Sequence, residues 1–279
     1  MFEDTADLST SALSRSLARE SLILPSTFTY NSEKSKQNGV KMKIKAIFFD
    51  LDGTLLPMDQ DTFISAYLGG LVKILAPRGY DPTLIGSALW QSTAAMMKND
   101  GSSSNEEVFW NSFARILGES VRSEEDLIQS FYEGDFQEIS KVCGYQPRAK
   151  ALVDMLKSKG MPLILATSPL FPTIATHSRI KWAGLDPSCF DYVTTFENSN
   201  YCKPNPKYYV DLLEKTGYKA CECLMIGNDV GDDMIAASVG MNVYLVTNDL
   251  INRKNIDITI FEHGDFDELC EYLEKLYEE

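Results

Sequence analysis

The sequence predicts an α/β protein with a Rossmann-like core, built on a parallel sheet, into which a bundle of helices is inserted. The first observation is an apolar run, Ala46 to Phe49, that ends in two aspartates and a glycine turn. Such a run is typical of a buried strand in a parallel sheet. The second is an alternation of helical segments and short apolar runs from residue 146 onward, with a glycine after four of the helices, which indicates βαβ units. The third is the stretch 58–142, whose apolar residues recur at helical spacing without a convincing strand.

Two aspartates, Asp50 and Asp52, follow the first predicted strand directly. Ligands of open α/β sheets bind beyond the carboxyl ends of the strands, so these side chains lie where chemistry is usually done. Two carboxylates this close repel each other unless a cation lies between them, and Mg2+ is a hard cation that takes oxygen ligands. An aspartate can also attack phosphorus as a nucleophile, and a second one can donate and accept a proton.

The segment from Ile47 to Leu55 resembles the first motif of the haloacid dehalogenase (HAD) superfamily, whose phosphotransferases carry a hydrophobic run followed by DxDGT. The resemblance implies that Asp50 attacks phosphorus and becomes an aspartyl phosphate. It also implies that Asp52 protonates the leaving group and then activates water. The dehalogenase branch of the superfamily lacks the second aspartate, so Asp52 argues against dehalogenation. Thr54, in the same motif, is a candidate substrate-binding residue.

Two further polar clusters follow predicted strands. Thr167 and Ser168 close the apolar run 163–166, and hydroxyls at a strand end, before a helix with free N–H groups, suit a phosphate. They are similar to the second motif of the superfamily, although a simple helix cap is the alternative. Lys203 stands in the sequence KPNP, which resembles the third motif. Its ammonium group, on a stiff turn, can neutralise the nucleophile and the phosphate together.

The last polar cluster, in the sequence GNDVGDD, contains Asp229 and Asp233. Residues four apart share a face of a helix, and the fourth motif of the superfamily has acidic residues at this spacing. The resemblance implies that they complete a Mg2+ site with Asp50 and Asp52. Asp229 is the candidate direct ligand, and Asp233 either binds the metal or orients Lys203 or a metal-bound water. Asn228 stands where the superfamily often has an acid, and Asp232 is expected to face solvent.

The rest of the pattern predicts the domain organisation. We expect residues 42–57 and 143–279 to form the α/β core domain, and residues 58–142 to form an inserted domain of four helices or more. In position, the insert resembles the helical cap of the superfamily, which closes over the site, excludes water and chooses the substrate. In the core domain we expect helices over 148–159, 173–183, 207–216, 232–239 and 265–277, and strands over 163–165, 192–194, 224–226 and 243–246.

Residues 1–41 differ from the rest of the chain, since they are rich in Ser, Thr, Asn and Lys and lack strong periodicity. We expect a disordered extension. An alternative is that the native protein starts at Met42, directly before the first strand. A signal peptide is not expected, because no hydrophobic segment there is long enough.

Composition narrows the possible partners and the compartment. The net charge of −14 and the lack of a basic stretch argue against a nucleic-acid partner, and no apolar segment has the length of a membrane span. The six cysteines show neither zinc-like nor redox spacing. They are expected to be reduced thiols in a cytoplasmic protein.

The function that these observations favour is Mg2+-dependent hydrolysis of a phosphate monoester, with a small phosphorylated metabolite as substrate. A phosphosugar mutase similar to β-phosphoglucomutase is the nearest alternative, because it uses the same four motifs. A phosphonate-cleaving enzyme would need a lysine in the cap as a Schiff base, and no lysine there is specially placed. A catalytically inactive binding module is an alternative of another class. The sequence indicates neither the substrate nor the oligomeric state.

Overall fold

The computed structural model describes residues 44–278, so the extension predicted over residues 1–41 lies outside the described residues. The strands are β1 (Ala46–Phe49), β2 (Leu163–Leu165), β3 (Tyr192–Val193), β4 (Cys223–Gly227), β5 (Asn242–Val246) and β6 (Glu262–Gly264). The helices are α3 (Gln60–Leu75), α4 (Pro82–Met97), α5 (Asn105–Leu117), α6 (Glu125–Glu133), α7 (Pro147–Ser158), α8 (Thr173–Trp182), α9 (Pro206–Thr216) and α10 (Phe266–Glu278). Short 3-10 helices include η1 (Ala76–Arg78), η2 (Glu119–Glu124), η3 (Asp135–Val142) and η6 (Met234–Val239).

The strands form one sheet in the order β3-β2-β1-β4-β5-β6, and all of its pairings are parallel. Phe48 of β1 lies opposite Ile164 of β2 on one side and Met225 of β4 on the other. The chain adds β2 and β3 on one side of β1 and then β4 to β6 on the other, so the strand order reverses at β1. Crevices for ligands in such sheets open at this reversal. The predicted parallel sheet is therefore confirmed, and its central strand is the one that precedes Asp50.

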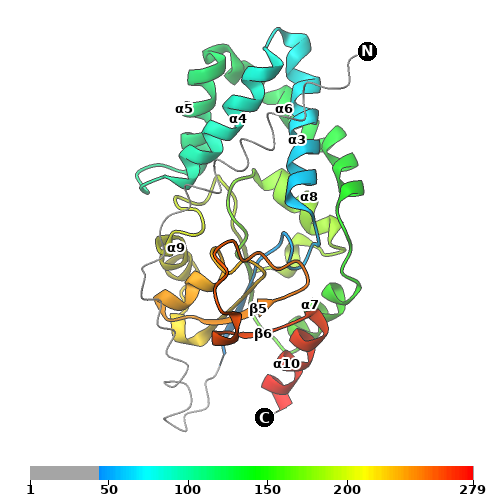
Figure 1. Cartoon of the computed structure of the whole chain (residues 1–279), viewed down its shortest axis with the longest axis vertical. Helices are drawn as coiled ribbons and strands as arrows, with labels where there is room; N and C mark the ends of the chain where they lie inside the picture. Colours follow the sequence, from blue (N-terminus) through cyan, green and yellow to red (C-terminus); the bar gives the residue numbers. More distant parts are fainter. Residues whose placement is uncertain (1–43, 279) are drawn as a thin grey trace.

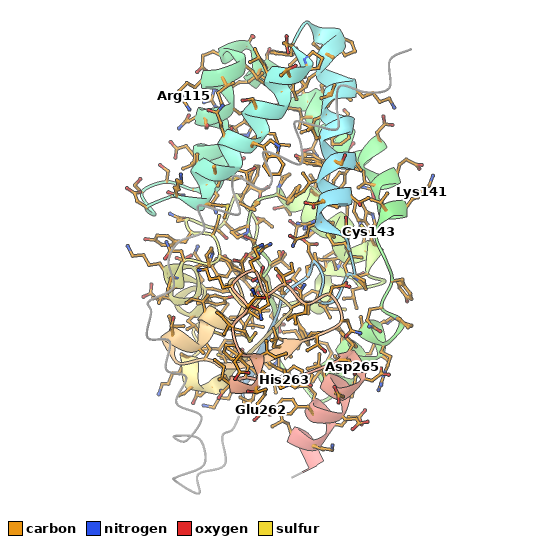
Figure 2. The ribbon with its side chains drawn as sticks, in the orientation of Figure 1. Arg115, Lys141, Cys143, Glu262, His263 and Asp265 are labelled. Atoms are coloured by element: carbon orange, nitrogen blue, oxygen red, sulfur yellow. The ribbon has the colours of Figure 1, made fainter. Side chains whose placement is uncertain are left out.

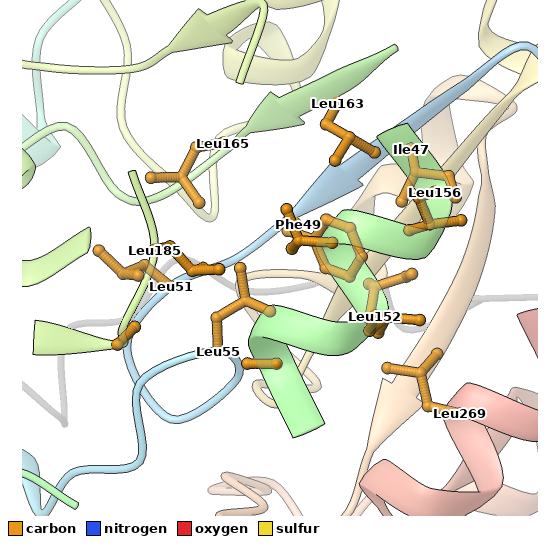
Figure 3. Close-up of a cluster of buried hydrophobic side chains, with 14 of the residues drawn as sticks. Ile47, Phe49, Leu51, Leu55, Leu152, Leu156, Leu163, Leu165, Leu185 and Leu269 are labelled. Atoms are coloured by element: carbon orange, nitrogen blue, oxygen red, sulfur yellow. The ribbon is translucent and has the colours of Figure 1, made fainter. Parts of the chain in front are cut away.

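Alternate residues of β1 pack on opposite faces of the sheet. Ile47 and Phe49 belong to a core with α7 and α10, and Figure 3 shows both beside Leu152 and Leu156 of α7. Ala46 and Phe48 instead belong to a core with α9 and η6. All four β1 side chains are fully buried. A strand that is apolar on both faces must be covered by helices on both faces. This packing fixes β1 in place, and with it the position of Asp50, which follows the strand directly.

The structure adds one strand that the sequence analysis missed. β6 pairs with β5 at the edge of the sheet, and its residues Glu262 and His263 are exposed (Figure 2). It has three residues and no apolar run, so its sequence carries no strand signal. The pairing with β5, rather than periodicity, makes this segment a strand.

The helix predicted over 232–239 is wrong in type and length. η6 is a 3-10 helix that begins only at Met234. The Asp229 carboxylate accepts the backbone N–H groups of Gly231 and Asp232, at 2.7 and 3.1 Å, which holds the preceding residues in a turn. Side chains that bind nearby backbone N–H groups compete with helix formation in this way.

The four helices predicted within 58–142 are present as α3, α4, α5 and α6, and they form the bundle at the top of Figure 1. The two chain segments that enter and leave the bundle meet at an antiparallel bridge between Met58 and Cys143. The bundle core continues into the sheet domain, because Phe171 lies 5.2 Å from Tyr67 of α3, between ring centroids. Contacts of this kind seat the bundle on the segment between β2 and α8.

Two further observations concern expectations from composition. All six cysteines are free thiols, as predicted. In the described part of the chain, no helix combines the length and the apolar character that crossing a bilayer requires.

Candidate active site

A buried lysine joins two of the predicted acidic residues at the carboxyl end of β1. The ammonium group of Lys203 donates to Asp50 Oδ1 at 2.8 Å and to Asp233 Oδ1 at 2.6 Å. Lys203, Asp50 and Asp233 are 2%, 7% and 1% exposed. Residues from the segments that follow three different strands, β1, β3 and β4, thus meet in one hydrogen-bonded group. Charged groups buried to this degree persist only when they are paired, which makes the arrangement rigid.

Electrostatics keep this lysine charged. Burial by itself lowers the pKa of Lys203, but the nearby carboxylates of Asp233 and Asp50 outweigh it and raise the pKa well above its usual value. A lysine with a raised pKa is a poor base and a stable cation. Lys203 therefore provides fixed positive charge beside Asp50.

Thr54 and Asn228 connect the first and fourth motifs. The Thr54 hydroxyl lies 3.3 Å from Asp50 Oδ2 and 3.1 Å from Asn228 Oδ1. The Asn228 amide donates to the carbonyl oxygen of Asp249 at 2.6 Å. Gly53 has a φ of +86°, and a Cβ there would lie 2.2 Å from Asn228 Nδ2. Glycine is thus required in the DxDGT turn both by its backbone conformation and by the close approach of Asn228.

Asp229 and Asp233 lie in a turn rather than on the helical path on which their spacing would place them on one face. The backbone N–H of Asp229 donates to Asp233 Oδ2 at 2.9 Å, so both oxygens of Asp233 hold donors. Asp229 Oδ2 forms an ion pair with Arg253 at 2.5 Å. Asp232 was expected to face solvent, but it is half-buried. Burial, followed by the Asp229 charge, raises the pKa of Asp232 to about 7.

Asp52 has a partner that the sequence analysis missed. The guanidinium group of Arg179, in α8, forms an ion pair with Asp52 Oδ2. Arg179 is fully buried, and its Cζ lies 4.5 Å from the ring centroid of Phe171. Loss of water raises the pKa of Asp52, and the Arg179 charge opposes this effect. Asp52 Oδ1 is buried and has no hydrogen-bond partner within residues 44–278.

A signal for Arg179 was nevertheless present in the sequence. Ala175 and Arg179 of α8 and Ala183, the residue directly after this helix, are spaced by four residues, and all three are fully buried. A charged residue on an apolar helix face is rare unless it is paired. Helical spacing could therefore have singled out this arginine, although not its partner.

The hydroxyl cluster after β2 is arranged differently from the prediction. Thr167 is buried, Ser168 is half-buried and α8 begins only at Thr173. The first N–H group of α8 donates to Glu197 Oε1 at 2.8 Å. Neither hydroxyl caps the helix, and that N–H group does not point to a phosphate beside Thr167. The prolines at 169 and 172 separate the strand from the helix, because proline restricts the residue before it to extended conformations.

The residues present fit a Mg2+ ion chemically. Five carboxylates face three cations here, so two negative charges are left uncompensated when all are ionised. Oxygen donors with excess negative charge are what Mg2+ prefers. Within residues 44–278, no three acidic, histidine or cysteine side chains already converge as metal ligands, and the Arg253 pair occupies Asp229 Oδ2. The carboxylates belong to Asp50, Asp52, Asp229, Asp232 and Asp233, and the cations are Arg179, Lys203 and Arg253.

Comparison with known proteins gives the same family as the motifs. A family model for haloacid dehalogenase-like hydrolases matches residues 44–240. Glyceraldehyde 3-phosphate phosphatase of Methanothermobacter thermautotrophicus is 23% identical over 244 residues, which cover 82% of this chain and all of that protein. The HAD phosphatase from Thermococcus onnurineus has a TM-score of 0.54 at 22% identity, over 82% of this chain and 98% of its own. A 2-haloacid dehalogenase from Pseudomonas syringae has a TM-score of 0.53 at 19% identity, over 83% and 99%.

The two solved structures share the fold of this chain, and they have different activities in their names. Fold alone therefore does not choose between phosphate and halide chemistry. The family model, however, spans well over half of the sequence. It includes all five carboxylates described above, Asp50, Asp52, Asp229, Asp232 and Asp233. The chain belongs to the haloacid dehalogenase-like hydrolase family.

Proposed function

We propose that this protein is a Mg2+-dependent phosphate monoester hydrolase that acts on a small phosphorylated metabolite through an aspartyl phosphate on Asp50. The observation that supports it most directly is the contact of buried Lys203 with Asp50, with Asp52 two residues further along the chain. Phosphoryl transfer to an aspartate needs a nucleophilic carboxylate, a fixed cation and a second carboxylate for proton transfer. Catalysis of this kind depends mainly on positioning and charge.

In this proposal the buried residues have separate roles. Asp50 attacks phosphorus in line with the leaving oxygen. Lys203 neutralises charge on Asp50 and on the phosphoryl oxygens. The hydroxyls of Thr54, Thr167 and Ser168 bind the phosphoryl oxygens. Bound Mg2+ would offset the negative charge of the phosphoryl group, with Asp50, Asp52 and Asp229 as its ligands. Of the two roles predicted for Asp233, orienting Lys203 is the one that its hydrogen bonds favour, because both of its carboxylate oxygens already accept donors.

Asp52 is the proposed acid and base. It would give a proton to the leaving oxygen and later take one from the water that cleaves the aspartyl phosphate. Arg179 contacts Asp52 but not Asp50, so it is a positioning residue that holds this carboxylate in place. Phe171, whose ring lies against Arg179, prevents the guanidinium group from swinging away.

The division into a core and a cap, over residues 42–57 with 143–279 and residues 58–142, is part of this proposal. The Met58–Cys143 bridge supports it, because both crossings of the chain lie side by side there. In the proposed enzyme the bundle covers the substrate and excludes water. The name of the relative from Methanothermobacter supports phosphatase activity, and Asp52 argues against the halide chemistry of the Pseudomonas enzyme.

The test is phosphate release from a panel of small phosphorylated metabolites, including glyceraldehyde 3-phosphate, with Mg2+ and with excess EDTA. Release that requires Mg2+ is the expected result. Products are identified as well as phosphate. Isomerisation of a hexose phosphate without free phosphate would contradict hydrolysis and identify a mutase.

Replacing Asp52 by Asn should affect substrates according to their leaving groups. With an alkyl phosphate, turnover should fall by about 10²- to 10⁴-fold, because no acid protonates the alkoxide. With p-nitrophenyl phosphate the phenolate leaves without a proton, so the first turnover should stay fast. A burst of nitrophenol, equal to the enzyme concentration, should then precede slow turnover, and stopped-flow absorbance measures it. Equal slowing of both substrates without a burst would refute the proton-transfer role.

Variants of Arg179 provide the matched test of positioning. Arg179→Met should show the same dependence on the leaving group in a milder form, and Arg179→Lys should restore part of the alkyl phosphate activity. If Arg179→Met slowed both substrates equally and gave no burst with p-nitrophenyl phosphate, the positioning role of the arginine would be refuted. Circular dichroism checks that each variant is folded, since removing one partner of a buried ion pair is costly.

Replacing Arg253 by Gln should strengthen Mg2+ binding. Arg253 is 47% exposed and occupies Asp229 Oδ2, so its charge competes with a metal for this oxygen. A pair at this exposure contributes on the order of 1 kcal/mol, and the Kd for Mg2+ should fall about fivefold. Isothermal titration calorimetry without substrate measures this Kd.

Arg148→Gln, which breaks an exposed pair with Asp267, is the control and should leave the Kd for Mg2+ unchanged. An unchanged Kd in Arg253→Gln would contradict the proposal that Asp229 is a metal ligand.

A further inference from the structure

A cavity of about 180 Å³ lies between the helical bundle and the loops that follow β2 and β3. Side chains from α3, α4, α5 and α6 line it on the bundle side, and the segments 170–172 and 196–197 close it on the side of the sheet. None of the residues of the carboxylate and lysine cluster lines it. A cavity of ~150 Å³ can hold a benzene molecule, so this one has room for a small organic group.

The cavity adjoins the proposed leaving-group side of the active site. Phe171 lines the cavity, and its ring contacts Arg179, which is paired with Asp52. Asp52 is the residue that would protonate the leaving oxygen. Phe171 also lies only four residues after Thr167, so their Cα atoms are at most roughly 14 Å apart. A leaving group that extends from the phosphate past Asp52 is therefore directed toward the cavity.

Aromatic rings make up much of the cavity wall, with eight aromatic side chains among its lining residues. Trp90 and Trp110 contribute indole rings from α4 and α5. The hydroxyls of Tyr67 and Tyr132 bond to each other at 2.6 Å, which satisfies them within the wall. The faces of such rings carry partial negative charge and attract cations.

Three glutamates, Glu106, Glu125 and Glu197, also line the cavity, whereas no lysine, arginine or histidine does so among the described residues. Burial raises the pKa of Glu106, and the charges of Glu197 and Glu125 raise it further, so both of these carboxylates repel that of Glu106. Glu197 Oε1 accepts the first N–H of α8, but Oε2 is buried and has no partner within residues 44–278. A buried carboxylate oxygen without a donor is costly unless a ligand supplies one.

These features distinguish between possible occupants. An anionic group would meet three carboxylates and no cation among the described residues that line the cavity. A neutral apolar group would fill the space but leave the Glu197 oxygen unpaired. An organic cation satisfies both the rings and the carboxylates. We propose that this cavity binds an amine or quaternary ammonium group carried on the leaving alcohol of the phosphate monoester.

That the cation is part of the substrate rests on the proposed function, whereas its binding can be tested separately. Tryptophan fluorescence of the full chain is titrated with choline and with its neutral analogue 3,3-dimethylbutan-1-ol. Trp90 and Trp110 line the cavity, so both ligands should change the emission. Choline should bind about tenfold more tightly. Equal affinities for the two would overturn the proposal.

Glu197→Gln tests the carboxylate, since the amide oxygen can still accept the N–H of Thr173. This variant should lose most of the tenfold preference and bind the neutral alcohol as before. Glu214→Gln, an exposed position on α9 away from the cavity, should keep the full preference. A preference for choline that persists unchanged in Glu197→Gln would contradict the assignment of the cation to this cavity.

Turnover of phosphocholine and 3,3-dimethylbutyl phosphate, with Mg2+, connects the cavity to catalysis. The cationic ester should have a kcat/KM about tenfold higher, and Glu197→Gln should abolish the difference. Hydrolysis of both esters at equal kcat/KM would overturn the cavity proposal while the proposed function stands. No hydrolysis of either ester, together with a choline preference that Glu197→Gln removes, would support the cavity and count against the proposed function.

Discussion

Asp50→Asn should abolish phosphate release, with a loss of at least about 10³-fold in kcat. An amide cannot attack phosphorus as a carboxylate does, and removing a nucleophile typically costs the whole of its catalytic effect. The change keeps the shape of the side chain, and Lys203 keeps its bond to Asp233 at 2.6 Å. The fold should therefore survive. Phosphate release with the best substrate of the panel, measured beside the melting temperature, checks both expectations.

A phosphoenzyme assay makes this test specific for the intermediate. Acid-quenched wild-type protein should contain a phosphorylated peptide that includes Asp50, and Asp50→Asn should lack it. Asp81→Asn is the control, because Asp81 is an exposed N-cap of α4 and asparagine caps helices equally well. Turnover near the wild-type rate in Asp50→Asn would refute the aspartyl phosphate mechanism.

Lys203→Met should have the largest effect on stability and should also remove activity. It leaves the carboxylates of Asp50 and Asp233 buried without their shared cation. Breaking a buried ion pair from one side costs about 3–5 kcal/mol, which for a chain of this size is a fall of about 10 °C in Tm. Thermal denaturation by circular dichroism measures it. Lys207→Met, the same substitution at an exposed position of α9, should stay within about 0.5 kcal/mol of the wild type.

The stability lost in Lys203→Met should depend on pH. Burial raises the pKa of Asp233, and Lys203 opposes that shift. In the variant the opposition is gone, so the folded protein binds protons more tightly than the unfolded chain. Its stability should then rise as the pH falls from 8 toward 5 and decrease as the pH rises. A deficit that is the same at every pH in this range would mean that lost packing, rather than buried charge, destabilises the variant.

Most of the buried cluster could be predicted from the sequence because its members belong to motifs in the segments that follow parallel strands. Asp50, Lys203 and Asp233 were assigned to separate motifs, and the structure brings them into one hydrogen-bonded group. The carboxyl ends of parallel strands lie at the same edge of the sheet. The order of polar clusters along the chain was therefore sufficient to predict their meeting, while their catalytic roles stay predictions.

The partners that come from helix faces and long loops could not be predicted in this way. Arg179 reaches Asp52 across 127 residues of sequence, from the interior of α8. Arg253 reaches Asp229 from the loop after β5, where the chain runs beside the fourth motif through a bridge at Ile251. Helical periodicity can indicate that a charged side chain is buried, but it cannot identify the residue that forms an ion pair with it.

By itself, the sequence determined the fold class, the buried central strand, the positions of four polar clusters and the place of the helical insert. These follow from local patterns, namely apolar periodicity and the polar residues that end each strand. Only the tertiary structure decided which cation pairs with which carboxylate, that Glu197 accepts the first N–H of α8, and that aromatic rings and three glutamates line one cavity. Each of these depends on contacts between residues far apart in the chain, and the packing of whole helices and loops sets such contacts.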